Sequence, residues 1–86
     1  MKARKPNGGW SAPLSRPLVL RDGKRLATLA DARDFVLALP PGYQERNAWQ
    51  RAAALLIEAA EHGGDVGAAT EQVVLALFLQ ARLRLE

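Results

Sequence analysis

The sequence predicts an α+β domain in which an N-terminal β-hairpin is followed by three helices, a ββααα order. An Asp-Gly dipeptide at positions 22 and 23 separates two short apolar runs, which is the clearest local signal for a hairpin. After it, apolar residues recur at helical spacing in three stretches, separated by Pro40-Pro41-Gly42 and by Gly63-Gly64. Strands followed by a run of helices are typical of α+β domains.

The hairpin is predicted from a two-residue type I′ turn, because both residues of an Asp-Gly dipeptide accept a positive φ. This turn places strands over residues 18–21 and 24–28. In this register Val19 faces Leu26, so these two side chains share one face of the hairpin, while Leu18 points to the other face.

The helices are predicted from their start and stop residues. Thr28 is a good N-cap, and Asp31 lies where a carboxylate meets the N-terminus of the first helix. The two prolines at positions 40 and 41 end that helix and begin a loop that reaches about residue 46. The glycine pair at 63 and 64 ends the middle helix, and Asp65 caps the last one. The three helices are predicted over residues 29–39, 47–62 and 66–83.

The chain is predicted to form one small domain over residues 17–84. Residues 1–16 are rich in Pro, Gly and Ser and are predicted to be a flexible basic arm, in which Trp10 docks on the body. Residues 85–86 could derive from an expression vector. The chain has no cysteine, and no apolar run is long enough to cross a bilayer, so we expect a cytoplasmic protein with no membrane partner.

Basic residues are concentrated in the first 27 positions, which carry seven Lys or Arg against one Asp. Residues 28–86 carry five Arg against eight acidic residues. A basic segment on an acidic body could contact nucleic-acid phosphates, although solubilising tails have the same composition. A nucleic-acid-associated accessory protein is therefore the alternative function. Its candidate phosphate contacts are Lys2, Arg4, Lys5, Arg16, Arg21, Lys24 and Arg25.

The sequence predicts no enzyme, because no group of residues makes a convincing catalytic, metal or cofactor site. His62, the single histidine, has Glu58 four residues before it and Asp65 three residues after it. Its place in the last turn of a helix is better explained by the carbonyls and dipole of that helix end. Asp31 and Asp34 lie near a helix N-terminus, where the dipole favours carboxylates in any case.

The last predicted helix contains the longest apolar run, residues 73–79. A helix packed on one side needs only one apolar stripe, and this run extends beyond one stripe. The hairpin has two open edges, and small chains often gain stability by association. We therefore predict a protein-interaction module that forms a homodimer or binds an unidentified protein partner; the alternative is that the run closes over the middle helix within one chain. The candidate interface residues are Leu75, Phe78, Leu79, Leu18 and Leu20.

Several short motifs resemble a family of alphaproteobacterial, mainly rhizobial, proteins that is described only as a domain of unknown function. The motifs are Trp10, Pro17-Leu18-Val19-Leu20, the segment 25–32, Leu39-Pro40, Ala52 and Gly63-Gly64. The similarity covers residues 10–82 and implies a compact α+β domain in a bacterial cytoplasm, with no site to carry over. The chain departs from the family at Leu39, where Trp is frequent, and in lacking a cysteine in the middle helix.

Overall fold

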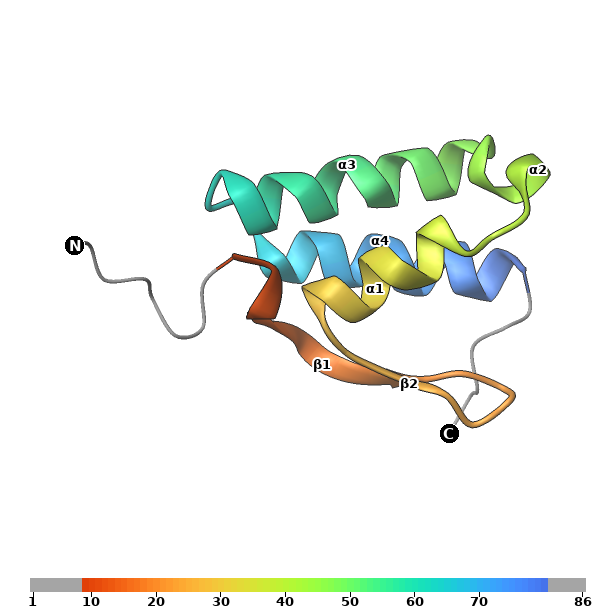
Figure 1. Ribbon diagram of the computed structural model, residues 1–86, viewed down its shortest axis with the longest axis horizontal. Helices are drawn as coiled ribbons and strands as arrows, with labels where there is room; N and C mark the ends of the chain where they lie inside the picture. Colours follow the sequence, from red (N-terminus) through yellow and green to blue (C-terminus); the bar gives the residue numbers. More distant parts are fainter. Residues whose placement is uncertain (1–8, 81–86) are drawn as a thin grey trace.

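The protein has a β-hairpin on one side, α1 and α4 in the middle and α3 on the other side (Figure 1). This computed structural model describes residues 9–80. It confirms the predicted hairpin-then-helices order and adds a short helix, α2, inside the predicted loop. The elements are η1 (Gly9–Ser11), β1 (Pro13–Val19), β2 (Arg25–Thr28), α1 (Leu29–Leu37), α2 (Pro41–Gln44), α3 (Asn47–Glu61) and α4 (Val66–Leu79).

The hairpin register differs by one residue from the predicted one. Leu18 pairs with Leu26, so the predicted pairing of Val19 with Leu26 is wrong. The turn is a three-residue loop in which Gly23 adopts a φ of 91° and donates its N–H to the Leu20 carbonyl at 2.9 Å. A shift of one residue reverses the face of every side chain on a strand. The observed register therefore places Leu18, Leu20 and Leu26 together against the core.

The domain begins earlier than predicted, because residues 9–16 do not form an irregular arm. They form η1 and the first half of β1, and Leu14 from this segment is buried in the core. The strand is irregular between Pro13 and Leu18, where the pairing with β2 shifts. Such an irregularity breaks the alternation of apolar and polar residues, so the first half of β1 could not be predicted from the sequence pattern. The first eight residues of the predicted arm lie outside the described residues. So do residues 81–86, which include the predicted end of the last helix and the segment that could derive from a vector.

Helix α1 begins at the predicted cap and ends two residues early. The Thr28 hydroxyl accepts the Asp31 N–H at 3.1 Å, and the Asp31 carboxylate accepts the Thr28 N–H at 3.1 Å, which completes a capping box. At the other end, Gln44 of α2 donates its side-chain N–H to the carbonyls of Leu37 at 3.3 Å and Leu39 at 2.7 Å. The chain therefore leaves α1 with the carbonyls of Leu37 and Leu39 hydrogen-bonded to this side chain rather than to the helix.

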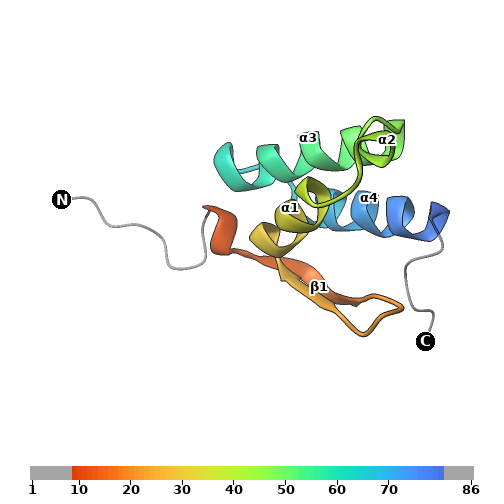
Figure 2. The same ribbon diagram turned by 45° about the vertical axis from the view of Figure 1, so that its right-hand side comes forward.

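Helices α3 and α4 form a helical hairpin around the predicted Gly-Gly break. Gly63 has a φ of 72°, and the Gly64 N–H donates to the Glu58 carbonyl at 2.8 Å. Asp65 then caps α4, as predicted, by accepting the Ala68 N–H at 3.2 Å. Helix α3 packs on α1 and α4, α4 packs on β1, and α1 packs on β2 (Figure 2). The largest fully buried side chains at the centre are Trp49, Leu20, Leu29, Leu56, Leu77, Val73 and Thr70.

Candidate interaction surface on α4

The outer face of α4 carries three large apolar side chains that remain about half exposed or more. Leu75 is 48% exposed, Phe78 55% and Leu79 64%. Their i, i+3, i+4 spacing places them side by side on one face of the helix. The opposite face is fully packed and consists of Ala69, Thr70, Val73, Ala76 and Leu77. We call Leu75, Phe78 and Leu79 the outer patch.

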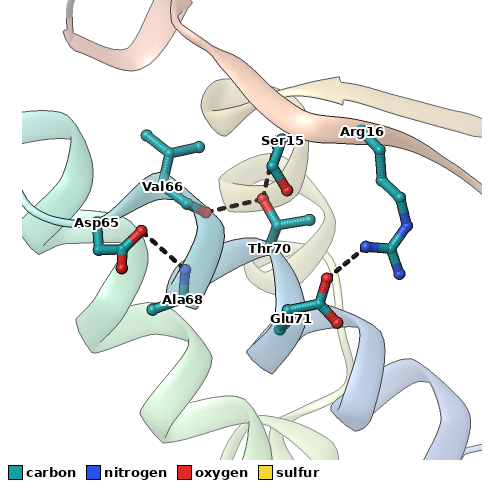
Figure 3. Close-up of polar contacts among 7 residues, drawn as sticks. All are labelled: Ser15, Arg16, Asp65, Val66, Ala68, Thr70 and Glu71. Atoms are coloured by element: carbon teal, nitrogen blue, oxygen red, sulfur yellow. Dashed lines mark hydrogen bonds and ion pairs between the residues drawn. The ribbon is translucent and has the colours of Figure 1, made fainter.

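Polar contacts at the flanks of α4 fix which face turns outward (Figure 3). The buried Thr70 hydroxyl donates to the Val66 carbonyl at 2.8 Å and accepts the Ser15 N–H of β1 at 3.0 Å. Glu71, one residue later, forms an ion pair with Arg16 of β1. On the side of α3, Gln72 donates its side-chain N–H to the Ala48 carbonyl at 3.2 Å.

The hairpin part of the predicted interface is wrong. Leu18 is 3% exposed and Leu20 1% exposed, so both belong to the core. The one-residue change in register places Leu26 on the same hairpin face as Leu18 and Leu20, and all three side chains belong to the core cluster.

Side chains also occupy backbone donors of both strands, which reduces what the hairpin edges offer to another chain. On β1, the Ser15 N–H is bound by Thr70. On β2, the Asp31 carboxylate accepts the N–H of Ala27 at 2.8 Å and the N–H of Thr28 at 3.1 Å. The hydrogen bond from the Ala27 N–H is the main reason why the pKa of Asp31 lies below its ordinary value.

Four of the candidate phosphate contacts, Arg16, Arg21, Lys24 and Arg25, lie on the hairpin in the described part of the chain. Arg16 is paired with Glu71, whereas Arg21, Lys24 and Arg25 lie exposed around the hairpin turn. Residues 9–80 contain seven Lys or Arg and eight Asp or Glu, so this part has no positive excess. Lys2, Arg4 and Lys5 lie outside the described residues.

His62 and Asp65, which were considered for metal or acid–base chemistry, are exposed and lie at the ends of two different helices. His62 is the exposed C-cap residue of α3, and Asp65 caps α4. Within residues 9–80, no three His, Cys, Asp or Glu side chains gather where they could hold a metal ion.

Trp10 docks on the body, as predicted, between α1 and α3. Its Nε1 donates to a Glu61 carboxylate oxygen at 3.1 Å, and the Arg33 guanidinium lies 4.9 Å from its ring centroid. A small apolar hollow of about 110 Å³ lies beside it, with Leu37 and Ile57 among its lining residues. Both of these side chains are exposed, and the sequence analysis did not single them out.

Comparison with known proteins identifies no relative: no family model, no curated protein and no solved structure matches the chain. The resemblance to the rhizobial family therefore stays a prediction. None of the helices in residues 9–80 combines the length and apolar character needed to cross a membrane.

Proposed function

We propose that this chain is a small, non-enzymatic interaction module of the cytoplasm that self-associates through the outer patch of α4. The observation that carries the proposal is the concentration of exposed apolar area. Six large apolar side chains are exposed among the described residues, and three of them lie on one face at the end of α4. Contiguous apolar patches on small domains are frequent sites of protein association.

A second copy of the same chain fits this patch because the patch is electrically neutral. Glu71, which is one turn before Leu75, is paired with Arg16. The described part of the chain carries nearly equal numbers of basic and acidic residues. The surfaces formed by residues 9–80 can therefore approach without strong repulsion, and a two-fold axis would place each outer patch on its counterpart.

The size of α4 limits the expected affinity. A stable interface takes about 800 Å² from each partner. A 14-residue helix is only about 21 Å long and about 10 Å wide, so contact between two copies of α4 alone covers less than that. We therefore expect a weak dimer with a Kd between roughly 10 µM and 1 mM.

Sedimentation velocity over a concentration series from about 10 µM to about 1 mM tests the proposal. The sedimentation coefficient should rise with concentration in the wild-type protein. Phe78→Ser and Leu79→Ser should each weaken association about tenfold or more while leaving the circular dichroism spectrum unchanged. A wild-type protein that stays monomeric to the highest concentration would overturn the proposal.

Leu37→Ser is a matched control for these variants. Leu37 is 67% exposed, close to the 64% of Leu79, but it lies on α1 rather than α4. Its replacement removes a comparable apolar area from the surface and should leave association unchanged. If Leu37→Ser and Leu79→Ser weaken association equally, association depends on exposed apolar area in general and not on α4. The assignment of the interface to the outer patch would then be wrong.

A further inference from the structure

A cleft of about 300 Å³ lies between β2 and α1, away from the outer patch of α4. Its apolar lining comes from the exposed Ala38 and from Leu26 of β2, Phe35 and Leu39, which are buried and reach the cleft with small parts of their surface. Lys24 and Arg25 line it from the hairpin, and Asp31 and Asp34 line it from α1. This volume is at the lower end of the range for small-molecule sites.

The acidic and basic side chains around the cleft differ in whether they already have a partner. Both carboxylates already have partners: Asp31 accepts two backbone N–H groups of β2, and Asp34 is bound by the Arg33 guanidinium at 3.0 Å. The side chains of Lys24 and Arg25 form no ion pair with any residue in the 9–80 range. The two cations are therefore the charged groups of the cleft that are available to a ligand.

We propose that this cleft binds a small amphiphilic anion, with the anionic head at Lys24 and Arg25 and an apolar body over Leu26, Phe35 and Leu39. An arginine beside a lysine suits a carboxylate head, because the guanidinium donates in a fixed fork and the ammonium adds a mobile charge. The ligand class is a free carboxylate on a short hydrocarbon or aromatic group.

The proposal does not depend on self-association. No residue of the cleft belongs to α4, and no residue of the outer patch lines the cleft. Phe78→Ser, which should disrupt the dimer, should therefore leave ligand binding intact. The two proposals can fail separately.

Titration of the full chain with octanoate, followed by ¹H–¹⁵N correlation spectra, tests the site. Octanoate should shift the backbone amides of Leu26, Phe35 and Leu39 in a saturable way, with a millimolar Kd, because a ligand of so few atoms gains limited affinity. Octylammonium, which has the same body and the opposite charge, should bind at least fivefold more weakly. Acetate, which has the head without the body, should not saturate. Absence of a saturable octanoate shift, or equal binding of octylammonium, overturns the proposal.

Three variants connect the binding to the named charges. Lys24→Gln and Arg25→Gln should each weaken octanoate at least threefold, and both residues are exposed, so the fold should tolerate the changes. Asp34→Asn should strengthen octanoate, because it removes a negative charge from the rim. Arg51→Gln on α3 is the matched control and should have no effect. If Arg51→Gln weakens octanoate binding as much as Arg25→Gln does, the affinity depends only on the net charge of the protein. That result would overturn the proposed site.

Discussion

The two faces of α4 are similar in sequence but opposite in environment. Val73 and Leu77 on the inner face are fully buried, whereas Leu75 and Leu79, each two residues further along, are 48% and 64% exposed. All four are branched aliphatic residues, so hydropathy does not distinguish them. The difference comes from what packs on each side, namely α3 and β1 on the inner face.

Three consecutive polar residues of α4 contact the elements that pack beside the helix. Thr70 binds the backbone of β1, Glu71 binds the side chain of Arg16 on the same strand, and Gln72 binds the backbone of α3. Since neighbouring residues on a helix point about 100° apart, three such contacts fix the rotation of the helix about its axis. The polar contacts of residues 70–72 thus help to set which side chains of the apolar run 73–79 turn toward the core.

The largest expected effect is on the inner face. Leu77→Ala should lower the free energy of unfolding by about 2–5 kcal/mol, because it leaves a cavity in a packed core. Leu75→Ala removes the same atoms from an exposed position and should cost less than about 0.5 kcal/mol. Urea unfolding of both variants at low protein concentration makes the comparison. Equal costs would show that the two faces of α4 are equally packed in solution.

The next effect concerns the hydroxyl that joins α4 to β1. Thr70→Val keeps the shape of the side chain but leaves the Ser15 N–H without its acceptor, which should cost about 1–3 kcal/mol. Thr70→Ser keeps the hydroxyl and loses only a methyl group, so it separates hydrogen bonding from packing. The urea midpoint should be lower for the valine variant than for the serine variant. The reverse order would mean that Thr70 acts by filling space.

Local signals were sufficient to predict the starts of α1 and α4 and the break between α3 and α4. The capping box of Thr28 and Asp31 involves residues three positions apart, and the Gly63 and Asp65 signals act within a few residues of each break. The apolar run of α4 is wider than one helix face, which favoured exposure of the outer patch but left open that the run closes over α3 within one chain. Its use as an interface stays a prediction.

Contacts between distant segments were not predictable in the same way. The hairpin register depends on whether the turn contains two residues or three, and an Asp-Gly dipeptide suits both. The Ser15 to Thr70 hydrogen bond joins residues 55 positions apart, and the cleft brings Lys24 beside Leu39. Nothing in the spacing of these residues indicates that they meet. Only the packing of the hairpin on α1 and α4 brings them together.

A smaller effect is expected at Asp31, which joins the start of α1 to β2. Asp31→Asn keeps an acceptor oxygen but removes the negative charge at the N-terminus of α1, so it should lower the free energy of unfolding at pH 7 by about 0.3–1 kcal/mol. The folded-state pKa of Asp31 is lowered, mainly by the hydrogen bond from the Ala27 N–H. The ionised carboxylate therefore stabilises the fold above the ordinary Asp pKa, and this stabilisation is lost as the pH falls through the lowered value.

Unfolding measured from pH 7 down to about pH 3 checks this dependence. The difference between the wild type and Asp31→Asn should be largest near neutral pH and should shrink in acid. Asp34→Asn is the control, because Asp34 is more exposed and binds no backbone N–H among the described residues. A difference that stays constant with pH would exclude the carboxylate charge as its cause.

A small effect on stability is expected from the ion pair beside the outer patch. Arg16 and Glu71 are both well exposed, so Arg16→Gln should change the free energy of unfolding by less than about 1 kcal/mol. Its effect on association should be larger, because an unpaired Glu71 then lies near the outer patch of both copies and the two charges repel. Arg16→Gln should weaken the dimer at low salt, and the double variant Arg16→Gln/Glu71→Gln should restore it, as sedimentation velocity would show. Failure of the double variant to restore association would mean that Arg16 contributes to the dimer by direct contact rather than by neutralising Glu71.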